Sequence, residues 1–167
     1  MDKLSNIHCA RLATLMLALT LCLPGCRRHE AELEPHLIVF DMGRMGIPEH
    51  EQFREVRNVK QLPNAVEQWF QGGIAEPGEK YFETDVGDSR LPIYRLLVAG
   101  TSSRYCIINY ERGGFAHAYT VALFALGTPR VNPVWVGRSG NFTTLRELKA
   151  AVESGKILEV RADKSSL

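Results

Sequence analysis

Apolar residues are distributed in two different ways along this chain. Near the amino terminus a 12-residue run, 12–23, is apolar apart from two threonines. Beyond residue 36 the apolar residues occur instead in short strand-like runs or at the spacing of a helix face, with polar links between them. The first pattern is typical of a targeting segment. The second predicts a folded domain that contains both helices and strands.

The centre of this domain has the pattern of an antiparallel sheet. Short links that contain glycine, serine or proline separate four strand-like runs, 93–99, 104–111, 115–126 and 131–136. Links of this length join antiparallel neighbours, because a parallel crossover needs about a dozen residues. We therefore expect a meander of strands.

Three further segments extend this pattern. A buried strand is expected at 36–40, before the meander, and an alternating, half-buried strand at 156–162 after it. The acidic, glycine-containing segment 72–90 predicts a long surface loop, with one short strand at 81–84.

Helical patterns flank the predicted meander. Pro48 suits the first turn of a helix, and the sequence predicts one over 48–58. A second helix is expected over 63–71, where apolar residues recur on one face before two glycines. A third begins after Thr144, since Thr144 and Glu147 have the spacing of a capping box.

Together these patterns predict an α+β fold. We expect an antiparallel β-meander of about four to six strands with two or three flanking helices. The length suits one domain, which we place at residues 36–162, with a tail at 163–167.

The amino-terminal segment carries a targeting signal. Its apolar run is shorter than the roughly 20 residues that a membrane-spanning helix needs. The run ends in Leu23-Pro24-Gly25-Cys26, which resembles the lipobox of bacterial lipoprotein precursors, with proline where a small residue is commoner. The resemblance implies that residues 1–25 are a signal peptide and that Cys26 becomes the first mature residue.

By this resemblance Cys26 carries a diacylglycerol and a further acyl chain. Each buried methylene contributes about 0.8 kcal/mol, so more than one chain gives a lasting membrane anchor. The protein is then expected in the bacterial cell envelope, facing the periplasm, and Arg27 in place of aspartate favours the outer membrane. Residues 26–35 form a polar tether, and the nine residues after Cys26 reach roughly 30 Å when extended.

The charge balance argues against one class of partner. Removal of residues 1–25 leaves 142 residues with 18 basic and 18 acidic side chains. A nucleic-acid-binding protein normally has a basic excess on one face, so no nucleic-acid partner is expected. The expected partners are the membrane, through the lipid on Cys26, and a protein of the periplasm.

The sharpest catalytic hypothesis pairs Cys106, the one cysteine left in the domain, with His117. If the two glycines between the strands form the turn, Cys106 faces Val121 and lies roughly 13 Å from His117. A turn one residue earlier places Cys106 opposite Tyr119 and about 7 Å from His117. The sequence favours a buried thiol over an intermolecular bridge, and a His117 hydrogen-bonded to Tyr110 or to the backbone.

No other catalytic motif is complete. The segment Gly137-Arg138-Ser139-Gly140 lacks the second glycine of a nucleophile elbow, where Asn141 stands. The histidines and carboxylates do not have the spacing of a metal site, so no metal and no cofactor are expected.

Four residues remain as candidates for surface contacts. Arg44 lies between a predicted strand and a predicted helix, where a cation could meet an anion. Tyr81 and Phe82 lie in the acidic loop and are expected to be exposed aromatic residues. His117 is the fourth candidate.

These observations favour a lipid-anchored envelope protein that acts as a non-catalytic binding, inhibitor or accessory module. An envelope hydrolase or thiol enzyme, with a site assembled from distant residues, is the alternative, and a structural spacer of the envelope is a third hypothesis. Whether the protein is an enzyme stays open, although the sequence favours binding over catalysis.

Overall fold

The computed structural model describes residues 37–47, 49–84, 89–128 and 132–160. The chain divides into two units, Met1–Glu32 and Leu33–Leu167, and all the described residues belong to the second. The predicted signal peptide, Cys26, the tether and the tail at 163–167 lie outside the described residues.

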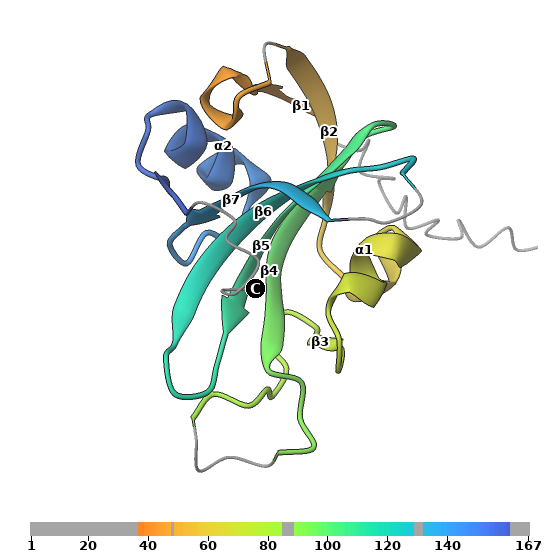
Figure 1. The fold of residues 1–167 in the computed structure, drawn as a ribbon, viewed down its shortest axis with the longest axis vertical. Helices are drawn as coiled ribbons and strands as arrows, with labels where there is room; N and C mark the ends of the chain where they lie inside the picture. The colour runs from red at the N-terminus through yellow and green to blue at the C-terminus, as the bar shows by residue number, and fades with distance from the viewer. Residues whose placement is uncertain (1–36, 48, 85–88, 129–131, 161–167) are drawn as a thin grey trace, which may run out of the picture. The chain divides into compact units, whose positions relative to one another are not determined.

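The described part is built on one eight-stranded sheet (Figure 1). Seven strands lie side by side, each antiparallel to its neighbours, and β3 (Ile74–Ala75) pairs parallel with β4. In spatial order the seven are β1 (Leu37–Asp41), β2 (His50–Val56), β4 (Tyr94–Thr101), β5 (Tyr105–Arg112), β6 (Ala118–Ala125), β7 (Pro133–Arg138) and β8 (Leu158–Glu159).

The predicted meander is confirmed as β4 to β7, and the α+β, largely antiparallel fold is confirmed with it. The strand count is larger than predicted. The additional strands are β2, where a helix was expected, and β3, whose two residues are too few to produce a recognisable pattern in the sequence. The strand expected at 156–162 is present as β8, but β8 contains only two residues and both are exposed. The segment 81–84 is not a strand.

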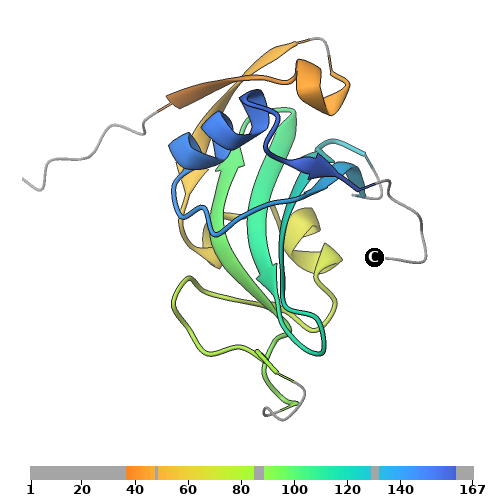
Figure 2. The ribbon, with the colours of Figure 1, turned by 90° about the vertical axis from the view of Figure 1, so that its left-hand side faces the viewer.

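Two helices cover opposite faces of the sheet, as the two perpendicular views show (Figures 1 and 2). They are α1 (Asn64–Trp69) and α2 (Leu145–Glu153), and two short 3₁₀ turns accompany them, η1 (Gly43–Met45) and η2 (Val59–Gln61). We refer below to the α1 face and the α2 face of the sheet.

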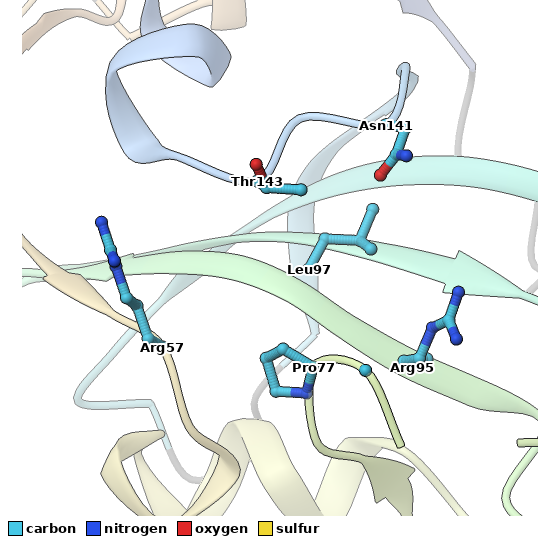
Figure 3. A pocket seen from close by; sticks show the side chains of 7 residues that line it. Arg57, Pro77, Arg95, Leu97, Asn141 and Thr143 are labelled. Carbon is cyan, nitrogen blue, oxygen red and sulfur yellow. The ribbon is translucent and has the colours of Figure 1, made fainter. Parts of the chain in front are cut away.

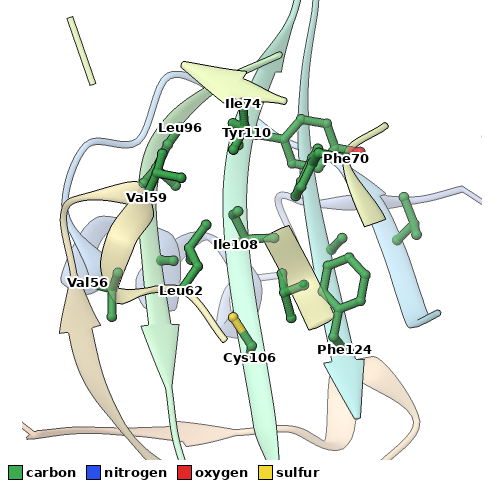
Figure 4. Packing of buried hydrophobic residues seen from close by; sticks show 14 residues of the cluster. Val56, Val59, Leu62, Phe70, Ile74, Leu96, Cys106, Ile108, Tyr110 and Phe124 are labelled. Atoms are coloured by element: carbon green, nitrogen blue, oxygen red, sulfur yellow. The ribbon is translucent and has the colours of Figure 1, made fainter. Parts of the chain in front are cut away.

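The α1 face carries a core of aromatic and aliphatic side chains (Figure 4). Phe70 meets the ring of Tyr110 edge-on, with centroids 5.1 Å apart, and Trp69 meets Phe124 at 5.3 Å. The predicted helix over 63–71 is confirmed by α1, because these apolar residues of its last turn pack on the sheet.

The α2 face carries the second core. Leu145, Leu148 and Val152 of α2 pack against residues of the sheet that include Phe53, whose ring meets Phe40 edge-on at 5.2 Å. The predicted capping box is confirmed: Glu147 N–H donates to the Thr144 hydroxyl, and the Glu147 carboxylate accepts from the Thr144 N–H.

The predicted helix over 48–58 is wrong, because the segment forms β2. Its inward positions on the α2 face are Glu51, Phe53 and Glu55, so two of the three side chains that should reveal a strand's alternation are charged. Glu51 is buried against Arg104. The Glu55 carboxylate accepts the Leu145 N–H at the start of α2, at 2.9 Å.

The first predicted strand is present, but it lies at an edge of the sheet. In β1 only Phe40 is fully buried, whereas Leu37 and Val39 are exposed. The strand is therefore not the buried element that its apolar run indicated. Position 36 of that prediction lies outside the described residues. Among the described residues no helix is long and apolar enough to cross a membrane.

Candidate functional site

A buried carboxylate, Glu111, lies near the end of β5 on the α2 face. It follows Ile107 and Asn109 on the same side of the strand and is 4% exposed. A carboxylate at such a position is costly unless its oxygens are paired. The Glu111 carboxylate therefore depends on the groups that pair with it.

Arg95 and His117 occupy the two oxygens of Glu111. Arg95 lies directly opposite on β4 and donates to Oε2 from Nε at 3.0 Å and from Nη2 at 2.5 Å. The other oxygen, Oε1, contacts Nε2 of His117. Burial opposes ionisation of Glu111, but these neighbours and Tyr81 outweigh it and lower the pKa of Glu111 below its ordinary value.

Tyr81 closes the cluster from the side. The Arg95 guanidinium lies 4.3 Å from the centre of the Tyr81 ring, a cation–π contact. Tyr81 is buried, and its hydroxyl makes no hydrogen bond of regular geometry. Burial, followed by the nearby Glu111 carboxylate, raises the pKa of Tyr81. The expectation that Tyr81 is an exposed loop aromatic is therefore wrong.

The loop that joins β5 to β6 projects from this cluster. Arg112 faces Ala118 in the register, which leaves residues 113–117 as the loop. Gly113 is packed so closely that an added Cβ would lie 1.9 Å from the carbonyl oxygen of Phe82, and its N–H donates to Ile93 O at 2.9 Å. The base of the loop is thus fixed to the segment before β4.

Phe115 lies in the middle of this loop and is 96% exposed. No other large apolar residue in the described part of the chain is exposed to this extent. We call Tyr81, Arg95, Glu111, Phe115 and His117 the hairpin site. It combines an exposed aromatic side chain with a buried charged network.

A groove of about 310 Å³ lies next to this network on the α2 face (Figure 3). Leu97 lies at its centre, between the segment that follows β3 and the segment that precedes α2. Its lining residues are Arg57, Pro77, Gly78, Arg95, Leu97, Asn141 and Thr143.

The thiol–imidazole hypothesis is wrong. Both predicted registers were wrong, because the loop holds five residues and Cys106 faces Phe124. Cys106 is buried among the side chains of the α1 face, and burial raises its pKa to about 12. Tyr110 also belongs to the α1 face, so His117 bonds Glu111 rather than Tyr110. The predicted burial of Cys106 is confirmed.

The two other surface candidates have different surroundings. Arg44 lies in η1, and a Cβ added at Gly155 would be 3.0 Å from its Nη1, so its guanidinium lies just beyond the end of α2. A cation there suits the negative end of the helix dipole, and the helix start that suggested an anion site is β2 instead. Phe82 is half-buried, with its carbonyl against Gly113.

The sequence did not identify Glu111, Asn109 or the groove. One signal was available: asparagine and glutamate within the apolar run of β5 are unusual in a buried strand and call for fixed partners. The partners themselves come from β4, from the 113–117 loop and from residues 139–142, and no local pattern could name them.

Comparison with known proteins finds no relatives: no family model, no curated protein and no solved structure matches the chain.

Proposed function

We propose that this chain is a lipid-anchored protein of the bacterial cell envelope that acts by binding a protein partner in the periplasm through the hairpin site. The anchor rests on the lipobox resemblance of Leu23-Pro24-Gly25-Cys26, with Cys26 as the lipid attachment point. Two lipid chains hold such a protein on its membrane without a spanning helix.

The exposure of Phe115 carries the binding half of the proposal. Covering a phenylalanine side chain releases about 1.5–3 kcal/mol of hydrophobic free energy, and aromatic residues are enriched among those that dominate protein interfaces. The loop below Phe115 is already held by Gly113, Glu111 and His117. Binding of a partner would therefore lose little conformational entropy in ordering this loop.

The register of the sheet favours a protein partner over the anchoring membrane. The described chain starts at Leu37 in β1, which faces Arg54 of β2. Arg54 in turn faces Thr101, at the end of the sheet where β5 begins. Phe115 follows the other end of β5, about 20 Å away at the usual strand rise. Figure 2 shows the start of β1 and the β5–β6 loop at opposite ends. Leu37, where the described chain begins, thus lies far from Phe115.

Site-specific crosslinking in intact cells tests the binding proposal. A photoreactive phenylalanine analogue at position 115 should give one discrete adduct, whereas the same analogue at position 134 should not, because Val134 is exposed on β7, outside the hairpin site. Phe115→Ala should weaken capture of the crosslinked partner about 30-fold. A purely structural spacer would give no specific adduct at either position, and that result would overturn the proposal.

Fatty-acid labelling tests the anchor separately. Radioactive palmitate should label the wild-type protein, and Cys26→Ser should abolish the label and release the protein from the membrane fraction. Equal labelling of both proteins would refute the lipobox assignment.

One observation favours the hydrolase alternative. The Glu111–His117 contact places a buried carboxylate against an imidazole, the arrangement that orients a general base. Within the described residues, however, no serine, threonine or cysteine side chain is hydrogen-bonded to His117. An activity lost in His117→Asn but retained in Phe115→Ala would support catalysis over binding.

A further inference from the structure

The edge of β4 that faces β2 is shared between two strands. β2 pairs with Ala99, Gly100 and Thr101 at the C-terminal end of β4, whereas β3 pairs with Tyr94 and Arg95 at its N-terminal end. Between them the ladder to β5 is interrupted, and Leu97 has no partner residue on any neighbouring strand. Bulges of this kind re-aim a side chain, and they are frequent next to binding sites.

The groove occupies this gap in the sheet. Leu97 forms its apolar centre, with Pro77 on one side and Asn141 and Thr143 on the other (Figure 3). An added Cβ at Gly78 would have no atom within 4 Å, so the groove is open there. Its volume of about 310 Å³ lies at the small end of the range for ligand sites.

A buried asparagine, Asn109, fixes one wall of the groove through its hydrogen bonds. Asn109, which is fully buried, donates to Gly140 O at 3.1 Å and to Phe142 O at 3.0 Å, and accepts from the Ser139 hydroxyl at 2.6 Å. The two carbonyls flank Asn141, so the Asn141 backbone is fixed while its side chain stays exposed.

A glutamate fixes the opposite wall. The Glu76 carboxylate accepts the Val59 N–H at 2.8 Å, which ties the segment leading to Pro77 to η2. Both walls are therefore formed before any ligand arrives, which reduces the entropy cost of binding.

The two arginines of the groove differ in how many of their guanidinium nitrogens already have a partner. Arg95 directs Nε and Nη2 to Glu111 and Nη1 to Glu79 O. Arg57 contacts Glu55 through Nε alone, and its side chain is 71% exposed. The terminal nitrogens of Arg57 therefore remain for a ligand, and one end of the groove is cationic.

The geometry points to a ligand with an α-carboxylate, an adjacent amide and an apolar side chain, as in the C-terminal residue of a peptide or an acylated amino acid. The carboxylate binds the terminal nitrogens of Arg57, the apolar group lies on Leu97 and Pro77, and the amide meets Asn141 or Thr143. A planar carboxylate suits the guanidinium fork. A phosphate dianion fits poorly, since the Glu55 carboxylate lies beside the same arginine.

Calorimetric titration of the protein, purified in detergent, tests this inference. The probes are N-acetyl-leucine, N-acetyl-alanyl-leucine and N-acetyl-alanyl-leucinamide, which lacks the carboxylate. The dipeptide acid should bind at least tenfold more tightly than its amide, because the amide lacks the hydrogen-bonded charge. If only the dipeptide acid binds, the ligand is a peptide terminus; if both acids bind equally, an acylated amino acid suffices.

Variants locate the site. Arg57→Gln should weaken binding of the acids about tenfold, and Leu97→Ser should also weaken it. The matched control Arg54→Gln, an exposed arginine on β2 that does not line the groove, should have no effect. Phe115→Ala should also leave the titration unchanged, so this inference and the proposed function can fail independently.

Four results would overturn the inference. The first three are equal binding of the dipeptide acid and its amide, no binding of either acid, and unchanged affinity in Arg57→Gln. Tighter binding of inorganic phosphate than of the acids would also overturn it. Thermal melting of each variant shows whether a loss of binding reflects a loss of fold.

Discussion

Replacement of Asn109 by alanine should destabilise the domain by about 3 kcal/mol. Asn109 is fully buried on the α2 face and makes three hydrogen bonds, to Gly140 O, Phe142 O and the Ser139 hydroxyl. Each intramolecular hydrogen bond contributes about 1 kcal/mol net, and a buried acceptor left without a donor costs at least as much. Water that enters the vacated space would reduce the loss.

Ser139→Ala provides the matched comparison. Its hydroxyl makes one of the three bonds, so it should cost about 1 kcal/mol. The double variant should be less destabilised than the sum of the two single variants by about 1 kcal/mol, because both remove the same bond. Additive effects would show that this hydrogen bond contributes nothing.

Urea unfolding followed by tryptophan fluorescence measures these free energies, since Trp69 and Trp135 lie on opposite faces of the sheet. The slope of free energy against urea should stay constant if only stability changes. A loss below about 1 kcal/mol in Asn109→Ala would refute the reasoning that this side chain holds residues 139–142.

Three further outcomes follow from the structure. Gly113→Ala should displace the segment at Phe82 and lower the melting temperature, because the added Cβ would lie 1.9 Å from the Phe82 carbonyl oxygen. Differential scanning calorimetry measures this change. The control Gly114→Ala should lower the melting temperature less, because a Cβ there meets no atom within 4 Å, although the φ of 90° strains it. The lowered pKa of Glu111 means that its ionisation stabilises the fold above the unfolded-state pKa and that this contribution disappears as pH falls through the folded-state value. The stability advantage of wild type over Glu111→Gln should therefore shrink in acid, as denaturation at several pH values would show. Cys106, whose pKa burial raises to about 12, should react with iodoacetamide at pH 8 only as fast as the domain unfolds; rapid labelling of the native protein would contradict its burial.

Local patterns were sufficient for the elements whose buried residues are mostly apolar. The meander and the capped helix α2 follow from hydrophobic periodicity and from Thr144 and Glu147, and these agree with the structure. The pattern failed at β2, where Glu51 and Glu55 occupy inward positions. A charged residue at an inward position is recognisable only when its distant partner is known, and here the partners are Arg104 and the start of α2.

The same reason explains why the candidate sites were not predicted. His117 and Tyr81 were selected separately, and only the fold brings them to the same carboxylate. The register error had a definite origin: two adjacent glycines suggested a two-residue turn, but Gly113 is required by its contact with Phe82. A glycine that permits close packing and a glycine that permits a turn are identical in a sequence.

The buried polar residues are confined to one face of the sheet, which links the two proposed sites. Among the described residues the buried charged and polar side chains are Glu51, Asn109 and Glu111, all on the α2 face, whereas the core of the α1 face consists of apolar and aromatic residues. Such groups each cost free energy to bury, and an apolar core would stabilise the domain as well. On the α2 face, two of them fix surface segments that the core alone would leave free: residues 139–142 beside the groove and the loop below Phe115. This asymmetry is the arrangement expected if the α2 face binds the partner and the ligand that we propose, while the α1 face stabilises the fold.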